Sequence, residues 1–100
     1  MSDRNSFKEV TGRHMKTLIQ YVPVVARVHG QNHPEFHEVH SLWKEMYQEI
    51  EKTGSERPEL NSVFAGLREV TDHYTVPDDV CESYGAVYQM LSELDQAYHS

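Results

Sequence analysis

Histidine is the residue type in this sequence with the clearest potential for chemistry, because seven of the 100 residues are histidine. Four of them fall in the short stretch V-H-G-Q-N-H-P-E-F-H-E-V-H, namely His29, His33, His37 and His40. Residues three or four apart share a helical face, and imidazoles on one face can hold a metal ion with a nearby carboxylate such as Glu35 or Glu38. The alternative is a polar helix start with histidines on its surface. A bare H-x-x-x-H spacing does not decide between the two.

His14 and Cys81 are the other residues whose surroundings suggest chemistry. His14 lies among apolar residues that repeat every three or four positions, so we expect it on the buried side of a helix. A buried imidazole needs partners for its ring nitrogens, and either a metal ion or a tyrosine or glutamate on a facing helix would serve. Cys81 is expected in the first turn of a helix, where the dipole favours a thiolate. It is either a reactive thiol or a small buried residue.

Motifs for enzymatic chemistry are absent from the sequence. It has no glycine-rich phosphate-binding loop, no G-x-S-x-G nucleophile elbow and no H-E-x-x-H zinc motif. A single cysteine excludes both a disulfide framework and a metal site made of thiolates alone. We therefore expect a protein that is not an enzyme.

The elements that must position these residues are helices. Apolar residues recur at intervals of three and four along nearly the whole chain, and three of the four prolines stand at the edges of the periodic segments. We expect helices over about residues 6–28, 34–53, 58–74 and 78–98. Short loops between four amphipathic helices predict an all-α, antiparallel, up-and-down four-helix bundle. With 100 residues, the chain is expected to form a single domain over residues 1–100.

The charge distribution limits the partners of this domain. The net charge is −7, and residues 69–100 contain acidic residues but no lysine or arginine. An acidic surface repels nucleic-acid phosphates and anionic lipids, so we expect neither nucleic acid nor a membrane as a partner. No apolar run approaches the roughly 20 residues of a membrane span, and no signal peptide follows Met1. A cytoplasmic location is the simplest expectation.

Two stretches of the chain resemble a known family. One is Y-V-P-V-V-A-R-V-H-G-Q-N-H-P-E-F-H-E-V-H, and the other is L-R-E-V-T-D-H-Y-T-V-P-D-D-V-C-E-S-Y-G-A-V-Y-Q-M-L-S-E-L-D. Their patterns V-H-G-x-N-H-P-E and Y-x-x-P-x-x-x-C-x-[ST]-[YW] occur in the same order in the hemerythrin-like domain of the iron–sulfur cluster repair di-iron (RIC) family. The resemblance implies a hemerythrin-like bundle with a non-haem di-iron site, and a role in restoring iron–sulfur clusters damaged by nitric oxide or peroxide.

The iron ligands of that family carry over to this sequence at one position, His29, which matches the histidine of V-H-G. The first-helix histidine of the family falls near Lys8, so His14 would replace it only with a different geometry. The histidine of the second-helix motif H-x-x-[KR]-E-[ED] falls near Thr53, and the segment with the third-helix histidine is missing. The final motif, H-x-x-L-E-N, would begin at about Ser100.

The resemblance thus implies the family's fold without most of its iron ligands. We expect a degenerate, non-enzymatic binding module that associates with itself or with a protein partner. The alternative is a metal-binding protein of nitrosative or oxidative stress, or of cluster repair, with His29 and His14 as ligands. No cofactor is predicted from the residues themselves, and iron is the candidate that the resemblance adds. A natural sequence that continues into H-x-x-L-E-N would favour the repair function.

Overall fold

The computed structural model describes residues 3–53 and 58–99, and every regular element in these two ranges is a helix. The helices are α1 (Asp3–His29), α2 (Glu35–Thr53), α3 (Asn61–Val70) and α4 (Glu82–His99). The prediction of an all-helical fold with four helices is therefore confirmed for the described part of the chain.

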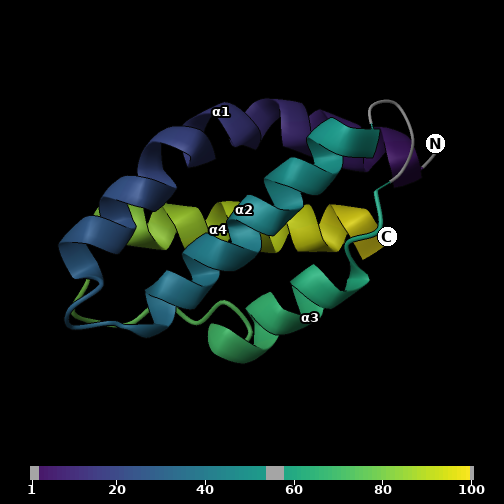
Figure 1. Cartoon of the computed structure of the whole chain (residues 1–100). Helices are drawn as coiled ribbons and strands as arrows, with labels where there is room; N and C mark the ends of the chain where they lie inside the picture. Colours follow the sequence, from purple (N-terminus) through teal and green to yellow (C-terminus); the bar gives the residue numbers. More distant parts are fainter. Residues whose placement is uncertain (1–2, 54–57, 100) are drawn as a thin grey trace.

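The first and last helices form the most extensive helix pair and lie side by side in Figure 1. The Phe7 ring near the start of α1 contacts the Tyr98 ring near the end of α4, with ring centroids 5.2 Å apart. At the other end of the pair, His29 contacts Tyr84 with a centroid separation of 5.5 Å. The two helices therefore run in opposite directions, and Figure 1 shows the direction alternating from each helix to the next.

A single apolar core fills the space between the helices. All four helices contribute fully buried side chains, which include Leu18 and Val22 of α1, Phe36 and Met46 of α2, Phe64 and Leu67 of α3, and Tyr84, Leu91 and Leu94 of α4. Burying a large apolar side chain stabilises the fold by roughly 1.5–3 kcal/mol. This core is the main force that holds the ends of the helices, and hence the polar residues on them, in place.

The last two helices are shorter at their starts than the sequence pattern predicts. Tyr98 fixes the residues before α3, because its hydroxyl donates to the Pro58 carbonyl at 2.7 Å and accepts from the Leu60 N–H at 2.9 Å. The last helix begins one residue after Cys81, whose carbonyl accepts a backbone hydrogen bond from the first turn at 3.3 Å. The first helix begins at residue 3, earlier than predicted. The predicted ranges 58–74 and 78–98 are corrected to residues 61–70 and 82–99.

The end of α3 is fixed by a left-handed turn. Asp72, His73 and Tyr74 have φ angles of 53°, 58° and 64°, a conformation that costs a residue with a side chain roughly 1–2 kcal/mol. The Thr71 hydroxyl accepts a hydrogen bond from the Tyr74 N–H at 2.8 Å, and the Thr71 carbonyl accepts one from the Thr75 N–H at 3.0 Å. These contacts hold in place a backbone that the periodicity alone assigns to a helix.

Replacing His73 with glycine is expected to raise the free energy of unfolding by about 1 kcal/mol. His73 is exposed and lies in the left-handed turn, so glycine relieves the backbone without removing a buried contact. Urea denaturation of both proteins measures the change. Ala65→Gly, at an exposed position in the middle of α3, is the control and should lower the same free energy by about 1 kcal/mol. A destabilised H73G would contradict the turn.

Candidate functional site

His29, the one residue that matches a family ligand, lies where the end of α1 meets the start of α4. Its Nε2 atom is 3.1 Å from the Cys81 Sγ atom, and its ring packs edge-on against Tyr84. Gly30 follows it because any Cβ atom there would overlap the Ala26 carbonyl and the His37 ring. Cys81 is exposed, so its interpretation as a small buried residue is wrong.

His33 lies between two carboxylates from different parts of the chain. Its Nδ1 atom is 3.0 Å from Glu35 Oε2 and its Nε2 atom is 2.9 Å from Asp79 Oδ1. Carboxylates only accept hydrogen bonds, so both ring nitrogens carry a proton in this arrangement. The hydrogen bond to Glu35 is the largest influence and, with that to Asp79, raises the pKa of His33 above 6.5 against the opposing effect of burial. His33 thereby links the start of α2 to the segment before α4.

Asp79→Asn is expected to lower the pKa of His33, because it removes one of the two carboxylates that favour the imidazolium. Titration of the His33 ring by NMR measures the pKa. Asp78→Asn removes a neighbouring charge that makes no contact with His33 among the described residues, and should change that pKa less. An equal effect of the two substitutions would contradict the contact.

The contacts of His33 with Glu35 and Asp79 also make the free energy of unfolding depend on pH. Because the pKa of His33 is higher in the folded chain than its ordinary 6.5, the stabilisation is fully present below pH 6.5. It is lost as the pH rises through the folded-state pKa. The free energy of unfolding of the wild-type chain should therefore fall with rising pH in that range, and fall less in the Asp79→Asn variant.

Two buried tyrosines connect Glu35 to the interior of the bundle. The Tyr84 hydroxyl donates to Glu35 Oε2 over 3.5 Å and lies 3.0 Å from the Tyr88 hydroxyl. Burial is the main cause that raises the pKa of both phenols, so both keep their protons at neutral pH. A pocket of about 340 Å³ opens beside them, lined by Glu35, Val70, Thr71, Asp72, Thr75, Pro77 and Tyr88.

His14 lies on α1 and faces Glu93 of α4, with its Nε2 atom 2.6 Å from Glu93 Oε1. A hydrogen bond from Gln89, followed by that from His14, lowers the pKa of Glu93. A glutamate on a facing helix is one of the two kinds of partner expected for this histidine. His14 and His29 are fifteen residues apart on one helix, which separates them by about 22 Å along its axis. They cannot bind the same metal ion.

The remaining histidines of the V-H-G segment do not complete a metal centre. His37 is exposed, and His40 is half-buried, with a pKa lowered first by burial and then by the charge of Lys44. Among the described residues, no three histidine, cysteine or carboxylate side chains are placed to hold one metal ion. This donor arrangement does not fit a di-iron centre. Binding of a metal at His29 or His14 singly stays a prediction.

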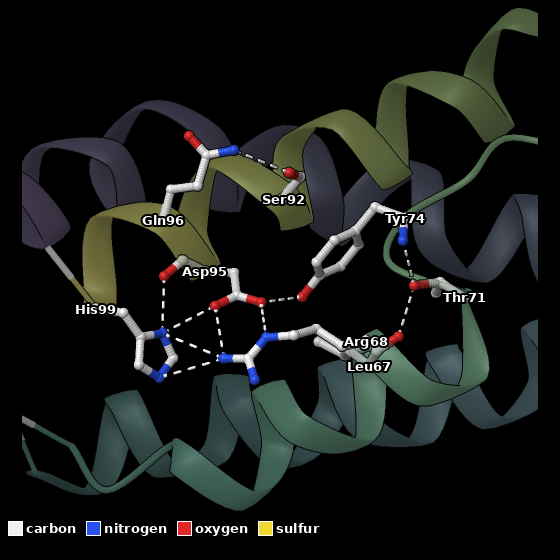
Figure 2. A network of polar contacts seen from close by, with 8 residues as sticks. All are labelled: Leu67, Arg68, Thr71, Tyr74, Ser92, Asp95, Gln96 and His99. Atoms are coloured by element: carbon white, nitrogen blue, oxygen red, sulfur yellow. Dashed lines mark hydrogen bonds and ion pairs between the residues drawn. The ribbon is translucent and has the colours of Figure 1, made fainter.

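A second polar cluster, which the sequence did not reveal, surrounds Asp95 of α4 (Figure 2). Arg68 donates to both carboxylate oxygens, from Nε at 2.9 Å and from Nη2 at 3.0 Å. The Tyr74 hydroxyl donates to Oδ2 at 2.7 Å, and His99 Nδ1 lies 2.8 Å from Oδ1. Burial raises the pKa of Asp95, but the hydrogen bonds from Arg68 and Tyr74 outweigh it and the pKa is lowered. The cluster ties α3, the left-handed turn and α4 together.

Comparison with known proteins gives one informative similarity. The chain is 23% identical over 127 residues to the iron–sulfur cluster repair protein ScdA of Staphylococcus haemolyticus, an alignment that covers 96% of this chain and 57% of that protein. The chain thus spans a little over half the length of this relative. No family model and no solved structure matches the chain. The similarity supports a distant relation to the iron–sulfur cluster repair proteins.

None of the described helices has the length and the apolar character that crossing a membrane requires.

Proposed function

We propose that this protein is a non-enzymatic, hemerythrin-like binding module, related to iron–sulfur cluster repair proteins, that acts through contacts with protein chains and holds no di-iron centre. One observation carries the proposal. The histidines that could serve as iron ligands are spread over the bundle, and each contacts a different partner: His29 contacts Cys81, His14 contacts Glu93, and His33 contacts two carboxylates. A di-iron centre needs its histidines and glutamates gathered in the bundle core.

The relation to repair proteins rests on the similarity to ScdA, whose name describes iron–sulfur cluster repair. The alternating direction of the helices is what a hemerythrin-like, antiparallel bundle requires. The proposal retains this fold and assigns the chain a role in binding rather than in iron chemistry. A cytoplasmic location, where repair of such clusters would take place, is part of the proposal.

Association with protein chains is supported by apolar side chains on the outside of α1. Val28 is 61% exposed and Val24 is 43% exposed, and these two residues are four apart and therefore share a face of the helix. Exposed apolar patches are typical of surfaces that contact another protein. We propose this face for contact with a second copy of the chain or with another protein.

Elemental analysis and solution mass together test the proposal. Untagged protein from iron-replete cells should contain far less than one iron per chain. A solution mass that is a multiple of the 11.6 kDa monomer would identify the partner as a second copy, and a monomeric mass would point to another protein. Stoichiometric iron that disappears in His29→Ala would contradict the proposal and favour the family site.

The alternative, a metal-binding protein of stress response or cluster repair, is favoured by the contact between His29 and Cys81. An imidazole nitrogen and a sulfur 3.1 Å apart are two ligands that suit zinc or iron. If this pair binds a metal, the metal content should fall to the same extent in His29→Ala and Cys81→Ser. His37→Ala, which alters an exposed histidine of the same segment, serves as the control.

A further inference from the structure

The pocket beside Tyr88 is a concave site in the described part of the chain with no assigned role. It lies between the start of α2, the end of α3, the left-handed turn and α4. Its volume of about 340 Å³ is at the small end of the roughly 300–1,000 Å³ range of ligand pockets, which suits one side chain or a small molecule.

The polar side chains that line this pocket present hydrogen-bond acceptors. Both contacts to the Glu35 carboxylate, from His33 and from Tyr84, reach Oε2, so within the described residues Oε1 is open. The Asp72 carboxylate has no partner among the described side chains, although its backbone carbonyl accepts from the Thr75 hydroxyl at 2.6 Å. These two carboxylates give the pocket a negative charge.

Hydroxyl groups of the pocket add further hydrogen-bond acceptors to the two carboxylates. The Tyr84 and Tyr88 hydroxyls lie 3.0 Å apart and either can be the donor, so the Tyr88 oxygen keeps at least one lone pair for an acceptor role. The Thr71 hydroxyl donates to the Leu67 carbonyl at 2.6 Å, and the Thr75 hydroxyl donates within the turn. A ligand for such a site must bring several hydrogen-bond donors and must not carry a negative charge.

The positively charged side chains near the pocket are engaged with other groups, so the pocket still favours a ligand that donates hydrogen bonds. The nearest arginine in the sequence, Arg68, is engaged with both oxygens of Asp95. His33 is cationic but lies between Oε2 of Glu35 and Asp79. The apolar part of the wall, from Val70, Pro77 and the Tyr88 ring, can pack against a short alkyl stem.

We propose that this pocket binds an alkylguanidinium group, presented as an arginine side chain by a protein partner. A guanidinium has five N–H donors in a planar fork and no acceptor, which complements carboxylates and hydroxyl oxygens. The alkyl stem packs on the apolar wall while the head reaches Glu35, Asp72 and the Tyr88 oxygen. That the arginine comes from a protein rests on the proposed function; recognition of the guanidinium does not.

Titration followed by amide NMR tests the proposal, with N-acetyl-arginine methylamide as the probe. Binding should saturate and shift the amide signals of Thr71, Asp72 and Tyr88. The citrulline analogue, which has the same shape but a neutral urea head, should bind at least about tenfold more weakly. Equal binding of the two probes, or no shift at the pocket with the arginine probe, would overturn the proposal.

Two substitutions locate the binding within the pocket. Glu35→Gln should weaken the binding of the arginine probe by about tenfold. Glu38 is an exposed acid one turn along α2, so Glu38→Gln should leave the affinity unchanged. Because Glu35→Gln also affects His33, Asp72→Asn provides a second test on an exposed side chain and should weaken binding several-fold. Unchanged affinity in both E35Q and D72N would refute the site.

The source of the guanidinium is tested separately with free arginine. Binding of the capped probe as tightly as free arginine, or more tightly, supports a protein side chain, because the free carboxylate is repelled by the pocket. A clear preference for free arginine would overturn the protein partner. The iron content and solution mass of the chain do not depend on these titrations, so failure of the pocket is distinguishable from failure of the proposed function.

Discussion

Replacing Asp95 with asparagine is expected to lower the free energy of unfolding by about 2–3 kcal/mol. The Asp95 side chain is 9% exposed and accepts hydrogen bonds from Arg68 and Tyr74 (Figure 2). An amide cannot accept both bonds of the guanidinium, and the charge of Arg68 loses its partner. The Arg68 side chain is 36% exposed, so water compensates part of the loss and the cost stays below that of a fully buried ion pair.

Urea denaturation at neutral pH measures this change, and Glu82→Gln is the matched control. Glu82 is an exposed carboxylate in the first turn of the same helix, where the helix dipole favours it, so its substitution should alter the free energy of unfolding by less than about 1 kcal/mol. An Asp95→Asn variant as stable as the control would show that the cluster does not contribute to stability.

The same carboxylate predicts how the protein responds to acid. The pKa of Asp95 is lower in the folded chain than its ordinary 3.8, so the stabilisation is fully present above pH 3.8. It is lost as the pH falls through the folded-state pKa. The wild-type chain should therefore lose more stability in this range than the Asp95→Asn variant does.

Removing the Tyr98 hydroxyl, by Tyr98→Phe, is expected to lower the free energy of unfolding by about 2 kcal/mol. This hydroxyl donates to the Pro58 carbonyl and accepts from the Leu60 N–H, both in buried contacts that fix the segment before α3. Phenylalanine keeps the ring packing but leaves two buried backbone groups without this partner.

Thermal and urea unfolding of Tyr98→Phe give the measurement, with Tyr47→Phe as the control. Tyr47 is half-buried and stacks on Trp43, but its hydroxyl has no partner among the described residues. Its loss should therefore change the free energy of unfolding by less than about 0.5 kcal/mol. If the two variants were equally stable, the role of the Tyr98 hydroxyl in fixing the start of α3 would be wrong.

The sequence predicts the helices well and the polar contacts poorly, for a physical reason. The period of apolar residues is a local property, so it indicates four helices and a buried face for each. The pairing of Arg68 with Asp95 joins residues far apart in the sequence, and only the packing of α3 on α4 brings them together. An aspartate within the apolar stripe of α4 was the available signal for this cluster.

The left-handed turn is a second feature that local sequence patterns do not predict. Asp72, His73 and Tyr74 contain no glycine, so local sequence rules continue the helix through them. The turn is selected instead by hydrogen bonds at Thr71 and by the Tyr74 hydroxyl, which reaches Asp95. For His14, in contrast, the apolar surroundings in the sequence did indicate the need for a partner, and Glu93 supplies it.

The central claim, that the bundle holds no di-iron centre, is tested most directly by calorimetric unfolding of the metal-free protein with and without Fe(II) under anaerobic conditions. A metal that binds the folded chain but not the unfolded one raises the unfolding temperature, and the stabilisation grows with the logarithm of the metal concentration over the dissociation constant. We expect the unfolding temperature to be the same with and without Fe(II). A rise of several degrees, in protein that binds two Fe(II) per chain, would contradict the claim.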